Sequence, residues 1–144
     1  MSNIEDIESE IIKSANYIYN TLGTAHNECV YQKALAIELH HLGYVIVETE
    51  KNVPVFYKDT REYIHTIGTE RIDIFARKNN VNVVLELKAT TGSIRNQVEM
   101  QQLKKYRFAL NQLNIESHVL LVIDFKQQVS EISRVAYMKL HEDV

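Results

Sequence analysis

The stretch RIDIFARKNNVNVVLELK, from Arg71 to Lys88, constrains the fold most, because it predicts two short strands joined by a tight turn. Asn tolerates the positive φ values of two-residue hairpin turns, so Asn79-Asn80 is the expected turn. Pairing then runs 78 with 81, 76 with 83 and 73 with 86. Asp73 therefore lies directly opposite Glu86, and Arg71 lies opposite Lys88.

Strand alternation divides this hairpin into two faces. One face is aliphatic and is the expected core: Ile72, Ile74, Ala76, Val83, Leu85 and Leu87. The other face carries Asp73, Phe75, Val84, Glu86 and Lys88. Directly opposed β-carbons lie about 4.5–5.5 Å apart, so the two carboxylates repel each other unless one binds a proton or both bind a cation.

A divalent cation would remove this repulsion. Mg²⁺ takes hard oxygen ligands and keeps several waters, so Asp73, Glu86 and the Leu87 carbonyl would suffice on the protein side. Lys88 on the same face could position an attacking water or stabilise charge on a phosphoryl oxygen. The alternative is a salt-bridged surface in which Arg71 and Lys88 neutralise the two acids. The hairpin alone leaves both interpretations open.

Helical patterns flank the hairpin on both sides. Apolar residues recur at helical spacing over 4–22 and 27–42, and Gly23 and Gly43 follow as stops. A third helix is expected over 93–113, with Ser93 as its N-cap.

Further strands are expected from period-two patterns at 44–48 and 53–57, with a turn at Lys58-Asp59, and Pro54 is typical of an edge strand. Residues 60–70 show no clear period. A buried strand is expected over 117–125, and a strand followed by a short helix within 129–140. This order predicts one α/β or α+β domain over residues 1–144, with a mixed central sheet of about four strands flanked by helices.

Composition excludes several classes of protein. The 144 residues, 45% of them hydrophobic, can bury the core of one domain. A net charge of −3 argues against coating nucleic acid through bulk charge. The single Cys29 forms no internal disulfide, and we find neither a signal peptide nor an apolar run of membrane-spanning length. We expect an intracellular protein, in the cytoplasm or in a virus-infected cell.

Four motifs in order resemble the PD-(D/E)XK nuclease superfamily. Ile72-Asp73 followed by Glu86-Leu87-Lys88 resembles its core motif, with Ile72 in place of the proline. LGTAHNECVYQKALAIELHHLGY, residues 22–44, resembles the small GxxExxY group: Glu28 and Tyr31 match, and Ala25 stands where the glycine is expected. QLKKY, residues 102–106, resembles the QxxxY motif, and LLVIDF, residues 120–125, resembles the strand that follows it.

The resemblance covers roughly residues 10–125. It implies a PD-(D/E)XK, restriction-endonuclease-like core and Mg²⁺-dependent cleavage of nucleic acid, with Mn²⁺ as a substitute. It implies a site made of Glu28, Asp73, Glu86 and Lys88, with Gln102 orienting a metal-bound water or a phosphate. Nucleic-acid contacts are then expected from Tyr31, Arg95, Lys104, Lys105 and Tyr106.

Each of these residues also has a plainer interpretation. Glu28 suits a helix N-terminus, Tyr31 suits packing, and the lysines suit a solvated helix face. We expect a nuclease acting on DNA rather than RNA, which could work as a homodimer. The alternative function is a catalytically inactive nucleic-acid- or protein-binding module in a larger DNA repair or restriction assembly.

Overall fold

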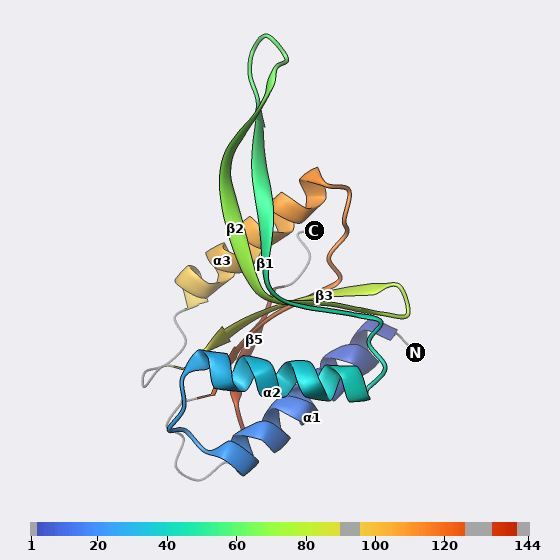
Figure 1. The fold of residues 1–144 in the computed structure, drawn as a ribbon, viewed down its shortest axis with the longest axis vertical. Coiled ribbons are helices and arrows are strands. Elements are labelled where there is room, and N and C mark those ends of the chain that lie inside the picture. Colours follow the sequence, from blue (N-terminus) through green and yellow to red (C-terminus); the bar gives the residue numbers. More distant parts are fainter. Residues whose placement is uncertain (1–2, 90–95, 126–133, 141–144) are drawn as a thin grey trace.

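The computed structural model describes residues 3–89, 96–125 and 134–140. They form a five-stranded sheet in the order β1-β2-β3-β4-β5 (Figure 1). The strands are β1 (Ile46–Lys58), β2 (Ile64–Lys78), β3 (Val81–Lys88), β4 (Val119–Asp124) and β5 (Ala136–Lys139). β3 and β4 run parallel, and the other neighbours pair antiparallel. The predicted mixed sheet flanked by helices is confirmed, with five strands instead of about four.

Helices cover both faces of the sheet. α1 (Asn3–Leu22) and α2 (Glu28–His41) pack on one face, where residues such as Ile11 and Leu35 meet Ile74 and Val83. α3 (Asn96–Gln112) joins β3 to β4 and packs on the other face, where Leu103 and its neighbours meet the central strands. The expectation of a single aliphatic core face was therefore wrong, because α3 buries the second face as well. Ile72 belongs to the α3 side.

The predicted hairpin is confirmed in its turn and in its register from Ile74 to Leu85, but the predicted pairs Asp73–Glu86 and Arg71–Lys88 are not part of the ladder. Asn79 and Asn80 have φ values of 52° and 63°, as a type I′ turn requires. Lys78 pairs with Val81 and Ala76 with Val83, and the ladder continues to Ile74 opposite Leu85. Asp73 and Glu86 are the next residues beyond this last pair, so the acidic positions lie where the two strands cease to pair.

The first two strands are much longer than predicted. The strands predicted at 44–48 and 53–57 are parts of one strand, β1, which begins at Ile46, and the unassigned segment 60–70 contains the start of β2. Together they extend past the sheet as a two-stranded ribbon (Figure 1), and we call residues 53–70 the arm. Pro54 lies on the edge strand, as expected. The arm turns at Asp59, whose side chain accepts hydrogen bonds from the backbone N–H groups of Arg61 and Tyr63.

The remaining boundaries differ in detail. The helix predicted over 93–113 is observed from Asn96, and the predicted N-cap Ser93 lies outside the described residues. The buried strand within 117–125 is confirmed as β4. The short helix expected at the end of 129–140 was wrong: Ala136–Lys139 pairs with β4 as an edge strand. None of the described helices is long and apolar enough to cross a membrane.

Candidate active site

Three of the predicted residues meet at the end of β3. Asp73 comes from β2, and Glu86 and Lys88 come from β3. The Leu87 backbone N–H donates a 2.7 Å hydrogen bond to Asp73 Oδ2, which holds this carboxylate against β3 after the ladder has ended. Glu86 directly precedes Leu87 on β3, and the charge of Glu86 acts on the Asp73 carboxyl. The structure therefore places the two predicted acids together at the end of β3.

Glu86 is nearly buried and has a partner on each oxygen. Tyr106 O–H donates to Glu86 Oε1 at 2.6 Å, and Lys88 Nζ lies 2.9 Å from Glu86 Oε2. Lys88 Nζ also lies 3.8 Å from Glu99 Oε2 on α3. These contacts hold the Glu86 side chain between β3 and α3.

The local environment shifts three ionisation equilibria. Burial, the Glu86 charge and, more weakly, Glu28 raise the pKa of Asp73 to about 7, although the Leu87 N–H opposes them. Burial disfavours the charged form of Lys88, but the hydrogen bond and charge of Glu86 outweigh it and raise the Lys88 pKa. Burial and the bond to Glu86 raise the pKa of Tyr106. Lys88 is therefore a cation and Tyr106 a neutral donor at physiological pH.

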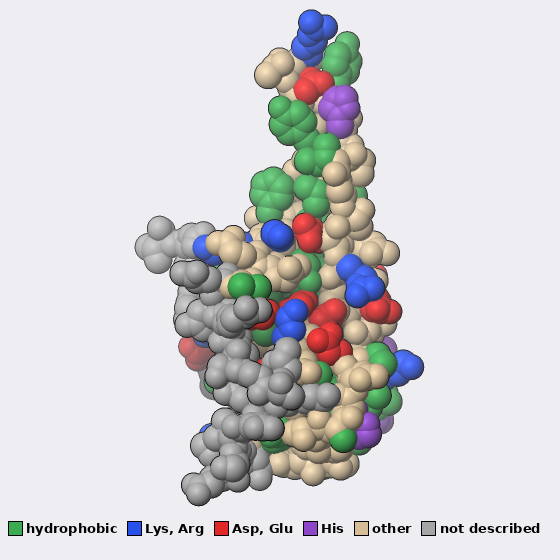
Figure 2. All heavy atoms as spheres, turned by 90° about the vertical axis from the view of Figure 1, so that its left-hand side faces the viewer, with side chains coloured by type: hydrophobic (Ala, Val, Ile, Leu, Met, Phe, Trp, Pro, Cys, Tyr) green, Lys and Arg blue, Asp and Glu red, His purple; other side chains and the backbone are tan. Residues whose placement is uncertain are grey.

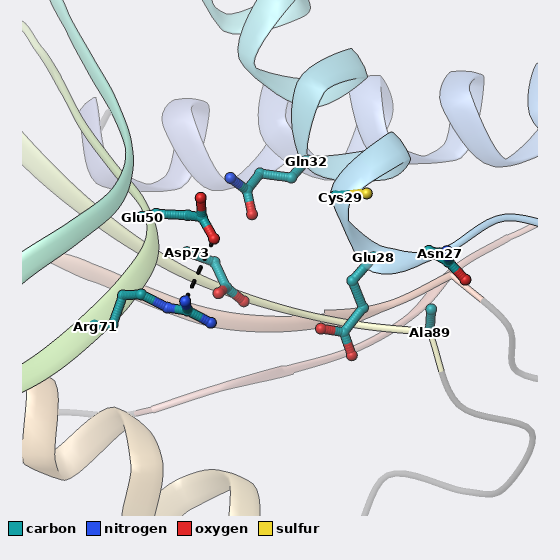
Figure 3. A pocket seen from close by; sticks show the side chains of 8 residues that line it. All are labelled: Asn27, Glu28, Cys29, Gln32, Glu50, Arg71, Asp73 and Ala89. Atoms are coloured by element: carbon teal, nitrogen blue, oxygen red, sulfur yellow. Dashed lines mark ion pairs between the residues drawn. The ribbon is translucent and has the colours of Figure 1, made fainter.

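A pocket of about 450 Å³ opens beside Asp73 (Figure 3). Its lining comes from α2, β1, β2 and the end of β3: Asn27, Glu28, Cys29, Gln32, Glu50, Arg71, Asp73 and Ala89. The Glu28 and Asp73 side chains project into this space. Glu28 is the first residue of α2 and acts electrostatically on both Asp73 and Lys88. The structure thus brings all four predicted acidic and basic residues to one place.

The salt-bridge interpretation holds for only one of the two predicted pairs. Lys88 pairs with Glu86, but Arg71 Nη1 pairs with Glu50 Oε1 at 3.5 Å instead of with Asp73. On β1, Glu50 lies between Thr49, which pairs with Ile74, and Lys51, which pairs with Ile72. Glu50 itself has no partner in this ladder, and its φ is 51°. This left-handed conformation is uncommon for a non-glycine residue. Asp73 therefore keeps carboxylates as its charged neighbours.

Two predicted nucleic-acid contacts are incompatible with burial. Tyr31 is fully buried, stacks on Phe125 with ring centroids 4.5 Å apart, and donates its O–H to the Gly23 carbonyl at 2.6 Å. Tyr106 is 2% exposed and its hydroxyl is bound to Glu86. Both predictions of substrate contact were wrong because these side chains point into the core. Tyr31 fixes the loop before α2, and Tyr106 orients Glu86.

The other α3 residues differ in their distance from the acids. Gln102 is partly exposed and lies about one helical turn before Tyr106, the residue whose hydroxyl binds Glu86. Lys104 and Lys105 are exposed and line a separate pocket of about 320 Å³ against the arm, with Val55, Glu70 and Phe108. Arg95 lies outside the described residues.

Sequence reasoning missed Glu50 and Glu99 as neighbours of the site. Glu99, Gln102 and Tyr106 have i, i+3, i+7 spacing, which places them on one face of α3. This spacing was a usable signal for Glu99. Nothing in the sequence marks Glu50, because its position depends on a backbone conformation that only the pairing of β1 with β2 reveals.

The donor set suits a hard divalent cation. In the described part of the chain, no three His, Cys, Asp or Glu side chains are grouped closely enough to hold a metal ion by themselves. Mg²⁺ needs fewer, because it usually binds one or two carboxylates and completes its shell with water and substrate phosphate. Burial and the neighbouring acids raise the pKa of Asp73, and a bound cation would favour its charged form.

One protein-family model matches this chain. The model of the PD-(D/E)XK nuclease superfamily matches residues 5–135. A search of curated proteins finds no match. Among solved structures, one described as the crystal structure of SSO0001 aligns with a TM-score of 0.47 and 16% identity over 98% of this chain. The chain spans 63% of the length of that protein.

Proposed function

Because the chain belongs to the PD-(D/E)XK nuclease superfamily, we propose that it is a single-domain, divalent-metal-dependent nuclease that hydrolyses phosphodiester bonds in DNA. The observation that carries this proposal is the meeting of Asp73, which the Leu87 N–H holds against β3, with Glu86 and its partner Lys88. The motif around Glu28 and Tyr31 supports membership of the GxxExxY group. An intracellular site of action is part of the proposal, since the single Cys29 suits a reducing compartment.

The proposal gives each residue a role. Asp73 and Glu86 would hold Mg²⁺ or Mn²⁺, together with the Leu87 carbonyl and Glu28. The bound ion would supply Lewis acidity toward the phosphate and a more acidic water. Lys88, which stays charged, would stabilise negative charge on a phosphoryl oxygen. Tyr106 and Gln102 would keep Glu86 oriented from α3.

A cleavage assay tests this proposal. Labelled double-stranded DNA, single-stranded DNA and RNA are incubated with the protein and Mg²⁺ or Mn²⁺. We expect cutting of DNA that EDTA abolishes, and a loss of at least about 100-fold in Asp73→Asn and Lys88→Met. Lys139→Met is the matched control, because Lys139 also pairs with a glutamate, Glu8, and lies on β5, two strands away from β3. Full activity in Asp73→Asn would overturn the assignment.

The alternative, an inactive binding module, has one observation in its favour. Both oxygens of Glu86 are already bound, by Tyr106 and by Lys88. A module of this kind would retain DNA without metal and cut none of the substrates. Fluorescence anisotropy with and without Mg²⁺, alongside the cleavage assay, separates the two functions.

A further inference from the structure

The arm exposes large apolar side chains away from the active site. Tyr57, Tyr63, Ile64 and Ile67 are each between 51% and 68% exposed. Figure 2 shows hydrophobic side chains along the projecting arm, above a band of charged ones. An isolated two-stranded ribbon is only marginally stable in water, and grouped apolar exposure marks an interaction surface. The arm is therefore a candidate for contact with a partner.

The β1 edge of the arm is protected. Gln112, at the end of α3, accepts the Phe56 N–H through Oε1 at 2.9 Å and donates through Nε2 to the Phe56 carbonyl at 2.7 Å. The side-chain amide thus takes the place of a neighbouring strand. Pro54 on the same strand offers no N–H at all. Such features prevent unwanted pairing along an edge strand.

The β2 edge of the arm lacks this protection. β3 pairs with β2 only from Ile74 to Lys78, so residues 64–69 have no described strand on their outer side. Their sequence, IHTIGT, contains no charged residue and no proline, and it is rich in β-branched residues. A register shift between Val55 and Phe56 leaves Ile67 without a partner on β1, and its side chain is 62% exposed. Natural edge strands with this composition are usually covered.

The charges of the arm favour an apolar protein partner over nucleic acid. The arm has no excess of positive charge, because Asp59, Glu62 and Glu70 outnumber Lys58 and Arg61. At its tip, His65 Nε2 lies 2.7 Å from Asp59 Oδ2, and Lys58 lies 3.8 Å from Glu62. A phosphate-binding surface would need an excess of positive charge. Segment 64–69 contains no Asp, Glu, Lys or Arg, so it can lie antiparallel to an identical segment without opposing two such side chains. Pairing of this kind is naturally two-fold symmetric.

We propose that residues 64–69 form an antiparallel strand pair with the same residues of a second copy of this chain. The two arms would join into one four-stranded ribbon, in which Ile64 and Ile67 gain contacts with side chains of the partner strand. This inference is independent of the proposed nuclease function, because the contact lies on the arm and needs neither metal nor nucleic acid.

Sedimentation velocity of the full chain from about 1 to 100 μM tests the proposal. We expect a concentration-dependent dimer, and at least about a 10-fold rise in its dissociation constant in Ile64→Lys and Ile67→Lys. Ile37→Lys is the matched control, because Ile37 is 56% exposed on α2, and it should leave dimerisation unchanged. Circular dichroism checks that each variant is folded.

A cysteine scan tests the same contact by cross-linking, without placing a charged residue in the edge strand. In a Cys29→Ser background, single cysteines at positions 64–69 should include at least one that cross-links two copies under mild oxidation, whereas Ile37→Cys should not. A monomer at every concentration, a dimer that persists in both lysine variants, or no cross-link at any of the six positions would overturn the proposal. Loss of DNA binding with an unchanged dimer would instead assign the arm to nucleic acid.

Discussion

At the scale of single residues, the Asp73 carboxyl lies where burial and neighbouring acids oppose its ionisation. Its pKa of about 7 exceeds the ordinary 3.8 of the unfolded chain, so between these values the folded state binds more protons. Stability therefore falls as pH rises toward 7. Asp73→Asn removes the charge but keeps an acceptor for Leu87. Without metal, we expect Asn to raise the unfolding free energy at pH 8 by about 1–2 kcal/mol, a value reduced because the carboxyl is partly solvated.

Urea denaturation at pH 8 and pH 4.5 in EDTA measures this effect. The advantage of Asp73→Asn should shrink at pH 4.5, where the folded wild type has Asp73 protonated. Glu48→Gln is the control, because Glu48 is exposed and pairs with Lys51 instead of with acids. A variant less stable than wild type at pH 8 would show that the Asp73 charge is stabilised in the fold.

Tyr106 tests whether orientation of Glu86 matters for the chemistry. Tyr106→Phe removes the hydroxyl that donates to Glu86 Oε1 and leaves the aromatic packing in place. Loss of one buried hydrogen bond should lower the unfolding free energy by about 1–2 kcal/mol. Metal affinity or cleavage rate should fall about 10–100-fold, as for other groups that orient metal ligands. Calorimetric titration with Mn²⁺ measures the affinity, and the exposed Tyr17→Phe is the control. An unchanged affinity for Mn²⁺ would show that Tyr106 contributes only to packing.

At the scale of elements, local signals predicted the structure well wherever they were strong. The helices ending at Gly23 and Gly43, and the hairpin turn at Asn79-Asn80, needed only short-range chemistry. The β2 half of the arm was missed because residues 64–69 are all exposed and show no alternation. The β5 strand was missed because only its pairing with β4 distinguishes it from a helix. Tyr31 and Tyr106 were misassigned because burial depends on elements distant in sequence.

The hairpin turn gives a prediction at this scale. Asn80 has a φ of 63°, a conformation that glycine adopts with less strain, and Asn-Gly is the preferred pair in type I′ turns. We expect Asn80→Gly to raise the unfolding free energy by about 0.5 kcal/mol, even though it removes the exposed contact with Arg77. Thermal unfolding measures the change. Asn80→Val, which is β-branched and disfavours positive φ, should destabilise instead. A stabilising Asn80→Val would contradict the turn assignment.

At the scale of the whole molecule, metal binding and folding are coupled if the acids form a metal site. An ion that binds only the folded state stabilises it by about 2.7 kcal/mol at a concentration 100 times its dissociation constant. For a chain of this size, that corresponds to a rise in Tm of roughly 5–10 °C. We expect Mn²⁺ or Mg²⁺ to produce such a rise at pH 8. The rise should be smaller at pH 5.5, where protons compete for Asp73.

Two variants distinguish a rise in Tm caused by an ion at Asp73 from a rise caused by an ion bound elsewhere. Asp73→Asn should abolish the rise in Tm, whereas Glu48→Gln, which removes an exposed carboxylate paired with Lys51, should keep it. An equal rise in Asp73→Asn would place the ion away from β3. If the wild type shows no rise, the scan is repeated with a non-cleavable DNA. A rise that needs both ligands would mean that substrate phosphate completes the metal shell, and no rise under either condition would favour the metal-free binding module.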